Sequence, residues 1–161
     1  MKLMKSIGIS ALALALGACA AGQTVQSGQA KESVSRQHFV KMWGIPEPYT
    51  YMENPLPKRH ETYEIGARVF ADHCASCHGA SGVGDGEGGR SLSPSPRNFL
   101  WLADVPEKQW DAYMYWSTAE GGDALGTAMP AYKDKLSKDE IWAVTEYIQE
   151  NFPFVSQWKT H

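Results

Sequence analysis

The chain has 161 residues, a length that predicts one modest domain with additional segments rather than two complete hydrophobic cores. Its formal net charge is −3 at pH 7, and no cluster of Lys and Arg occurs along it, which argues against a nucleic-acid-binding protein. Of its three cysteines, only Cys74 and Cys77 lie beyond the N-terminal segment that ends at Cys19. No disulfide framework is therefore expected unless these two pair with each other.

Residues 1–18 have the order of features found in an export signal. Lys2 and Lys5 give a positive start, and a short apolar run over 7–16 is followed by small residues. Because this run is too short to span a membrane as a helix, we expect a signal peptide that is removed. A buried N-terminal helix is the alternative. Removal takes away two lysines and no acidic residue, so the net charge of the mature chain becomes −5.

The end of this segment, Leu-Gly-Ala-Cys at 16–19, resembles the lipobox of bacterial lipoproteins. The resemblance implies that Cys19 is lipidated and becomes the first mature residue, so that the protein is anchored to a membrane without spanning it. Ala20 rather than Asp follows, which in the usual sorting pattern favours the outer over the inner membrane. Ordinary signal cleavage nearby is the alternative.

Two segments of different composition come next. Residues 19–37 are rich in Gln, Ser, Ala, Gly and Lys, and we expect a flexible membrane tether. Residues 38–60 interleave aromatic residues with four prolines, which disfavour a regular helix. We therefore expect an extended strap that lies on the domain surface, with a patch for a partner as the alternative.

The globular part is expected over residues 61–154, followed by a C-terminal tail at 155–161. Three helices are indicated, one before Cys74, one that starts near 104–107 and ends at Gly121, and one that begins with a capping box at Ser137. The expected buried positions are Tyr63, Gly66, Ala67 and Phe70; Trp110, Tyr113, Met114 and Ser117; and Ile141, Val144, Thr145, Ile148 and Phe152. No segment shows the alternation of a strand, so the predicted fold class is all-α with long loops.

The strongest chemical signal is the sequence Cys-Ala-Ser-Cys-His at 74–78. Two thiols three residues apart at the end of a helix can add to the two vinyl groups of one haem, and the next histidine then lies beneath the ring with a nitrogen directed at iron. The motif therefore predicts one haem c held covalently by Cys74 and Cys77, with His78 as an axial ligand of the iron.

Other interpretations of these residues are weaker. A zinc site needs further ligands, and His60 and His73 have unsuitable spacing. A thioredoxin-like dithiol needs a βαβ context that is not indicated. Residues 84–89 satisfy G-x-G-x-x-G, but a dinucleotide site requires a preceding strand and a following helix. We interpret 84–89 as a turn-rich connection around the haem edge.

Over roughly residues 62–152 the chain resembles the class I c-type cytochromes. The resemblance rests on Gly66 and Phe70, the motif at 74–79, the loop rich in Gly and Pro, Met129-Pro130 and the aromatic last helix. It implies a cytochrome c-like fold of about three to four helices. It also implies that the first and last helices cross closely at Gly66, with Phe70, Trp142 and Tyr147 in the contact.

The resemblance further implies that a methionine before the last helix is the second axial ligand, and Met129 has that place. His/Met ligation raises the reduction potential and fills both axial positions, which favours a carrier of electrons over an enzyme. The carbonyl of Pro94 or Pro96 is expected to accept the second ring N–H of His78. Further candidates for contact with the haem, its propionates above all, are Arg97, Asn98, Trp101 and Tyr132.

These observations favour a membrane-tethered monohaem cytochrome on the periplasmic side that passes single electrons between redox partner proteins. The second hypothesis is a haem-carrying accessory subunit of a larger oxidoreductase. The third is a haem enzyme or gas sensor in which Met129 is absent from the iron or easily displaced.

Overall fold

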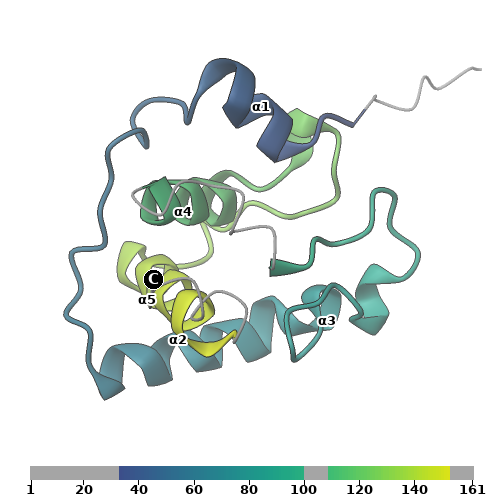
Figure 1. Cartoon of the computed structure of the whole chain (residues 1–161). Coiled ribbons are helices and arrows are strands. Elements are labelled where there is room, and N and C mark those ends of the chain that lie inside the picture. Colours follow the sequence, from purple (N-terminus) through teal and green to yellow (C-terminus); the bar gives the residue numbers. More distant parts are fainter. Residues whose placement is uncertain (1–32, 100–108, 153–161) are drawn as a thin grey trace, which may run out of the picture. The chain divides into compact units, whose positions relative to one another are not determined.

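The computed structural model describes residues 33–99 and 109–152. The expected signal peptide, Cys19, Trp101, the helix start at 104–107 and the C-terminal tail lie outside these ranges. Within them the chain forms helices, turns and no strand, which confirms the all-α prediction (Figure 1). The elements are α1 (Arg36–Trp43), α2 (His60–His73), α3 (Ala75–His78), η1 (Glu87–Gly89), α4 (Trp110–Glu120), η4 (Asp123–Leu125) and α5 (Lys138–Asn151).

Helices α2 and α5 cross in close contact at Gly66 (Figure 1). A Cβ atom at this position would lie only 2.1 Å from the carbonyl oxygen of Ala143, so a side chain here would force the helices apart. Beside the crossing, the ring of Tyr147 packs against those of Tyr63 and Phe70, with centroids 5.0 and 5.4 Å away. The close approach expected at Gly66 is therefore present.

Trp142 differs from the expectation, because it does not fill the crossing. Its indole packs on Tyr115 of α4, with ring centroids 4.2 Å apart. Consecutive helical residues point about 100° apart, so a side chain next to Ala143 in α5 is turned away from α2. Trp142 therefore joins α5 to α4.

Helix α4 is buried around nearly its whole circumference rather than on one face. The predicted residues Trp110, Tyr113, Met114 and Ser117 are buried, and so are Ala112, Tyr115, Trp116, Thr118 and Ala119. The reason is that α4 has neighbours on different sides, α5 through Tyr115 and α1 through Trp116. The helix ends where Gly121 adopts a φ of 63°, a value that favours glycine.

Helix α5 begins as predicted. The Ser137 hydroxyl accepts a hydrogen bond from the Glu140 N–H at 3.2 Å, and the Glu140 carboxylate accepts one from the Ser137 N–H at 2.8 Å. This capping box satisfies backbone donors that the first turn would otherwise leave without partners. The predicted apolar positions of α5 are buried, with Phe152 at its C-terminal cap.

The segment expected to be an extended strap opens with helix α1, which also takes in the last residues of the expected tether. The prolines begin only at Pro46, so they do not obstruct a helix that Ser35 caps and Gly44 ends. Residues 44–59, called the strap below, are irregular. Asn54 fixes the strap, because its N–H donates to Asp111 at 2.9 Å.

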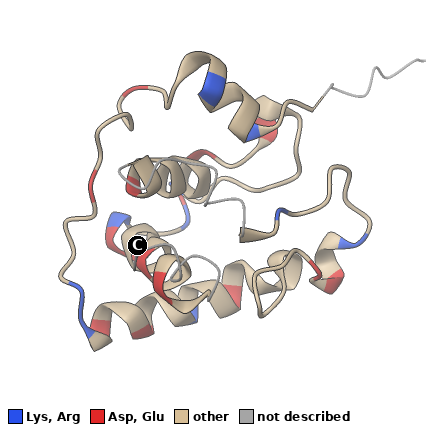
Figure 2. Ribbon diagram, viewed as in Figure 1, with Lys and Arg blue, Asp and Glu red and all other residues tan. Residues whose placement is uncertain are grey.

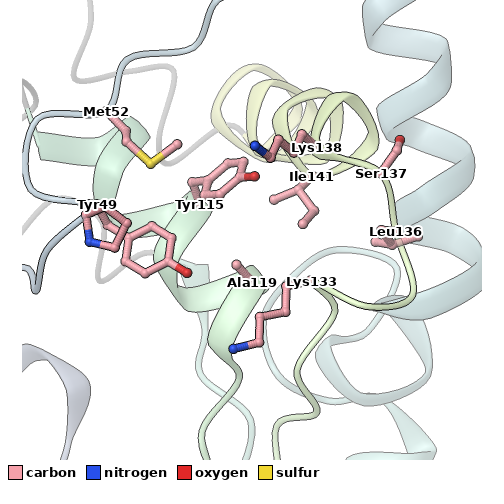
Figure 3. A pocket seen from close by; sticks show the side chains of 10 residues that line it. Tyr49, Met52, Tyr115, Ala119, Lys133, Leu136, Ser137, Lys138 and Ile141 are labelled. Carbon is pink, nitrogen blue, oxygen red and sulfur yellow. The ribbon is translucent and has the colours of Figure 1, made fainter.

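The strap also borders a pocket of ≈ 430 Å³ between itself, α4 and the start of α5. Figure 3 shows Tyr49 and Met52 of the strap on one side of this pocket and Tyr115 and Ile141 on the other. Two of its lining residues bind Glu120, which accepts hydrogen bonds from the Tyr49 hydroxyl and, at 2.8 Å, from the Lys133 ammonium. The strap is thus attached to the domain by a largely exposed polar cluster as well as by apolar packing.

Charged residues are dispersed over the described part of the chain, and its Lys and Arg side chains do not gather in one patch (Figure 2). Lys58 of the strap pairs with Glu146 and Glu150 of α5 at 3.3 and 3.4 Å. Among the helices described, none has the length and apolarity that a bilayer crossing requires.

Candidate haem site

The two cysteines of the motif lie on one tight turn. Cys74 ends α2, and the four-residue helix α3 follows it directly. The N–H groups of Cys77 and His78 both donate to the Cys74 carbonyl, at 3.2 and 2.9 Å. Both thiols are free and half-buried, and burial, with Cys77 nearby, raises the pKa of Cys74 to about 12. The turn therefore presents two free thiols next to one imidazole.

His78 is held in a defined orientation. Its Nδ1 lies 3.1 Å from the carbonyl oxygen of Arg97, and its ring stacks on Phe99 with centroids 4.8 Å apart and planes at 16°. Burial lowers the pKa of His78, which favours the neutral ring. A neutral histidine that donates its Nδ1 proton to a carbonyl keeps the lone pair of Nε2 for a metal.

The carbonyl that contacts His78 belongs to Arg97 and not to Pro94 or Pro96, which corrects the expectation. The Phe99 N–H donates to the Gly82 carbonyl at 2.9 Å, and this bond together with the stacked ring sets the register of the loop. The Pro96 carbonyl faces Gly84 instead, where a Cβ atom would lie 2.3 Å from it. Pro94 is exposed. The register of this loop thus places the Arg97 carbonyl, rather than that of either proline, next to Nδ1 of His78.

The loop at 84–89 packs directly on the motif. A Cβ atom at Gly86 would lie 2.4 Å from the Ser76 carbonyl, and one at Gly89 would lie 2.8 Å from the Cys77 carbonyl. At Gly88 the nearest side-chain atom is the sulfur of Cys77, 3.6 Å from such a Cβ. The loop contains the short helix η1 and no preceding strand, so it does not have the structure of a dinucleotide fingerprint.

Met129 lies in the loop between η4 and α5, and its side chain is half-buried. The Gly122 N–H donates to the Met129 carbonyl at 2.8 Å, and Gly121 packs on the backbone from Met129 to Ala131. Further on, the Tyr132 N–H donates to the carbonyls of α4. The end of α4 therefore supports the loop that carries Met129.

Tyr132 connects this loop to the motif. Its hydroxyl donates to the carbonyl of His73 at 2.7 Å, one residue before Cys74. Its ring also packs edge-on against the His73 imidazole, with centroids 5.8 Å apart, and burial raises the pKa of Tyr132. The structure thus places Tyr132 next to the turn that carries Cys74.

The other predicted haem contacts have different outcomes. The Arg97 side chain donates to the Gln37 side-chain oxygen of α1 at 2.9 Å, so Arg97 reaches His78 through its backbone. Asn98 is half-buried next to it. Sequence reasoning missed Phe99 and Gln37. An aromatic residue shortly after the proline loop was a usable signal for Phe99, whereas nothing in the local sequence marks Gln37.

The residues present fit a covalently bound haem better than a zinc ion. In the part of the chain that the structure describes, no group of three or more His, Cys, Asp or Glu side chains is placed to hold a metal ion. Cys74 and Cys77 therefore lack the further ligands that a zinc site requires there. Two free thiols and one oriented imidazole match the donor set for haem c, and loop 84–89 covers the motif with backbone rather than side chains.

Residues 61–148 match the family model for cytochrome c oxidase, cbb3-type, subunit III. The chain belongs to this family of c-type cytochromes. Cytochrome c550 of Pseudomonas aeruginosa is 25% identical over 146 residues, which cover 91% of this chain and 88% of that protein. Cytochrome c6 of Anabaena variabilis is 31% identical over 83 residues, 52% of this chain and 84% of that protein.

A second group of relatives is much longer than the cytochrome described here. The cbb3-type cytochrome c oxidase subunit FixP of Sinorhizobium medicae is 36% identical over 100 residues, which cover 62% of this chain and 31% of FixP. Among solved structures, the reducing HAO-like protein complex of Kuenenia stuttgartiensis is similar, with a TM-score of 0.49 and 26% identity, over 68% of this chain and 52% of that chain.

The family gives this cytochrome its general activity. It is a c-type cytochrome that carries electrons and is not an enzyme, and membership of the family implies covalently bound haem c. The family match begins at residue 61, so α1 and the strap precede it.

Proposed function

We propose that this cytochrome is an exported, lipid-anchored carrier on the periplasmic side that passes single electrons between redox partner proteins. Cys74 and Cys77 would hold one haem c, with His78 and Met129 as the axial ligands of its iron. The observation that carries the proposal is the orientation of His78, whose Nδ1 is engaged by the Arg97 carbonyl while its Nε2 is left for a metal.

The residues around His78 suit electron transfer because they restrict its movement. The Arg97 carbonyl accepts a hydrogen bond from the Nδ1–H group of His78, and the stacked ring of Phe99 limits rotation of the imidazole. When bound, the haem would supply a reversible one-electron change at iron. A ligand that does not need to rearrange between the two oxidation states keeps that exchange fast.

Ligation by Met129 rests on the support of its loop. Backbone hydrogen bonds tie this loop to the end of α4, and Tyr132 ties it to the turn before Cys74. Of the other described methionines, Met114 is buried within α4, Met52 lines the pocket under the strap and Met42 is exposed. Two filled axial positions would leave no place for a substrate, which agrees with a carrier.

Export and membrane attachment rest on the sequence of the first 19 residues. The positive start, the short apolar run and the lipobox-like segment that ends at Cys19 support a lipid anchor. A tether between Cys19 and α1 would raise the local concentration of partners held at the same membrane. The same sequence weakly favours the outer membrane.

The test is a visible absorption spectrum of the full-length, haem-loaded protein, recorded oxidised, reduced and then with carbon monoxide. A low-spin c-type spectrum that carbon monoxide leaves unchanged is expected, and the Met129→Ala variant is expected to bind carbon monoxide. Met52→Ala is the matched control and should behave as the unmutated protein. Rapid binding to the unmutated protein would contradict His/Met ligation and favour the sensor or enzyme hypothesis.

A second function is favoured by the relatives themselves. Both the matching family model and FixP carry the name of an oxidase subunit. This cytochrome would then pass electrons to one larger oxidoreductase or accept electrons from it. The segment before residue 61 would be the docking element. Co-purification of this cytochrome with one stoichiometric partner from solubilised membranes would support the subunit hypothesis. A monomer that reduces several unrelated acceptors would support the free carrier.

A further inference from the structure

Helix α1 lies before the region that matches the family. It nevertheless contacts the end of α4, through Gly121, and the loop that contains Arg97. Arg36, in its first turn, places its guanidinium over the indole of Trp116, 4.4 Å from the ring centroid. The same guanidinium donates a hydrogen bond to the carbonyl of Gly121. Arg36 thus joins the N-terminal segment to the end of α4.

Gly121 is the point on which the Met129 loop rests. A Cβ atom there would lie within 2.7 Å of the backbone of Met129, Pro130 and Ala131, so these residues are in direct backbone contact with it. The next residue, Gly122, donates its N–H to the Met129 carbonyl. A group that fixes the Gly121 peptide therefore fixes the support of Met129.

Two neighbours of Arg36 hold α1 in the register that this contact requires. The Val34 N–H donates to the Leu125 carbonyl at 2.9 Å, at the end of η4. The Gln37 side chain accepts a hydrogen bond from Arg97 at 2.9 Å, on the loop whose carbonyl orients His78. Residues on both sides of Arg36 are thus bound to η4, which precedes the Met129 loop, and to the loop that orients His78.

The environment of Arg36 makes its hydrogen bond stronger than a surface contact. Burial lowers the pKa of Arg36, as expected for a guanidinium removed from much of its water. A charged donor forms shorter and stronger hydrogen bonds than a neutral one, and the contact with an indole adds to it as solvent is excluded. The Gln37 contact, by comparison, is exposed.

We propose that Arg36 is a positioning residue for the Met129 ligand, acting through the Gly121 carbonyl and the Gly121–Gly122 turn. This inference rests on the proposed ligation by Met129. It assigns to a helix outside the family match the task of holding the Met129 loop in the position that the proposed ligation would require.

The first experiment measures hydrogen exchange in the full-length, haem-loaded protein and in its Arg36→Met variant. Methionine keeps the aliphatic stem and removes the charge and the donors. We expect the amides of Gly122, Thr127 and Tyr132 to exchange about tenfold faster, the change that loss of one hydrogen bond from a charged donor predicts. Lys41→Met is the control, because Lys41 is an exposed cation of the same helix.

Amides in the middle of α5 report on the whole fold in the same experiment. If their exchange accelerates together with the loop, Arg36 contributes to general stability and the inference is overturned. Unchanged exchange at Gly122 and Thr127 in Arg36→Met overturns it as well. Arg36→Lys keeps a cation over Trp116 that can still reach the carbonyl, so it should recover much of the loop protection.

The second readout is the rate at which carbon monoxide binds to the ferrous protein, since this requires Met129 to leave the iron. Arg36→Met is expected to bind about tenfold faster than Lys41→Met. Faster loop exchange with an unchanged rate would support the contact of Arg36 with the loop and contradict Met129 as the ligand. That outcome separates a failure of the proposed function from a failure of this inference.

Discussion

The hydroxyl of Tyr132 donates a hydrogen bond to the carbonyl of His73, and this 2.7 Å contact joins the loop after Met129 to the last turn before Cys74. Residues on the two proposed axial sides of the haem are thereby connected through one side chain. His73 also packs edge-on against the same ring, with centroids 5.8 Å apart.

Replacement of Tyr132 by Phe keeps the ring and removes the hydroxyl. We expect the free energy of unfolding to fall by about 1 to 2 kcal/mol, because the His73 carbonyl loses its partner in a partly buried place. Urea unfolding of the haem-loaded protein measures this. Tyr51→Phe is the control, since Tyr51 is 89% exposed and should show no change. Equal stability of the Tyr132 variant would mean that water replaces the hydroxyl.

Gly66→Ala tests the crossing of α2 and α5. Its Cβ would meet the Ala143 carbonyl at 2.1 Å, so the helices must separate, and a loss of roughly 1 to 3 kcal/mol or more is expected from overpacking. Thermal or denaturant unfolding gives the number. Arg68→Ala, on the exposed side of the same helix, should change stability by less than about 0.5 kcal/mol. A stable Gly66 variant would contradict the close approach.

Stability should decrease in acid through Glu120. Hydrogen bonds from Lys133 and then Tyr49 lower the pKa of this carboxyl below its ordinary value of 4.5. A carboxyl whose pKa is lower in the folded state stabilises the fold above its unfolded pKa, and this contribution is lost as the pH falls through the folded pKa. Glu120→Gln should therefore flatten the dependence of the urea midpoint on pH below about 4.5. An unchanged dependence would assign the acid sensitivity to other carboxyls, of which Glu140 also has a lowered pKa.

Cys19→Ser tests the lipid anchor. If Cys19 is lipidated, the unmutated protein should remain with the membrane fraction after a high-salt wash, and labelled fatty acid should be incorporated. The variant should lose the label and appear in the periplasmic fraction or remain as a longer precursor. Incorporation of label into the variant would place the modification elsewhere.

Local patterns predicted much of the fold. The capping box at Ser137, the glycine at the crossing and the motif at 74–78 each depend on residues close together in sequence or on a steric need that only glycine meets. Helix α1 was missed because its stability comes from tertiary contacts, such as the packing of Phe39 on Trp116. Its own sequence is too short and too polar to form a stable helix without those contacts, so it gives no clear helical pattern.

The candidate site shows the same division. Its donor residues could be predicted from their types and spacing, but the choice of the Arg97 carbonyl over those of Pro94 and Pro96 could not. That choice depends on the register of an irregular loop, which Phe99 sets by a backbone bond and a stacked ring. Trp142 likewise turned from α2 to α4 because one step along a helix changes the direction of a side chain by about 100°.

The hydrogen bond from Val34 to Leu125 has a consequence for where this cytochrome could work. It binds the chain to the domain at Val34, so a lipid on Cys19 would lie 15 residue steps from this hydrogen bond, and 15 steps span at most about 54 Å. This upper limit would keep the domain within a thin zone next to the membrane surface. Electrons would pass only to proteins whose acceptor centres stand inside that zone, and the search for them would be nearly two-dimensional.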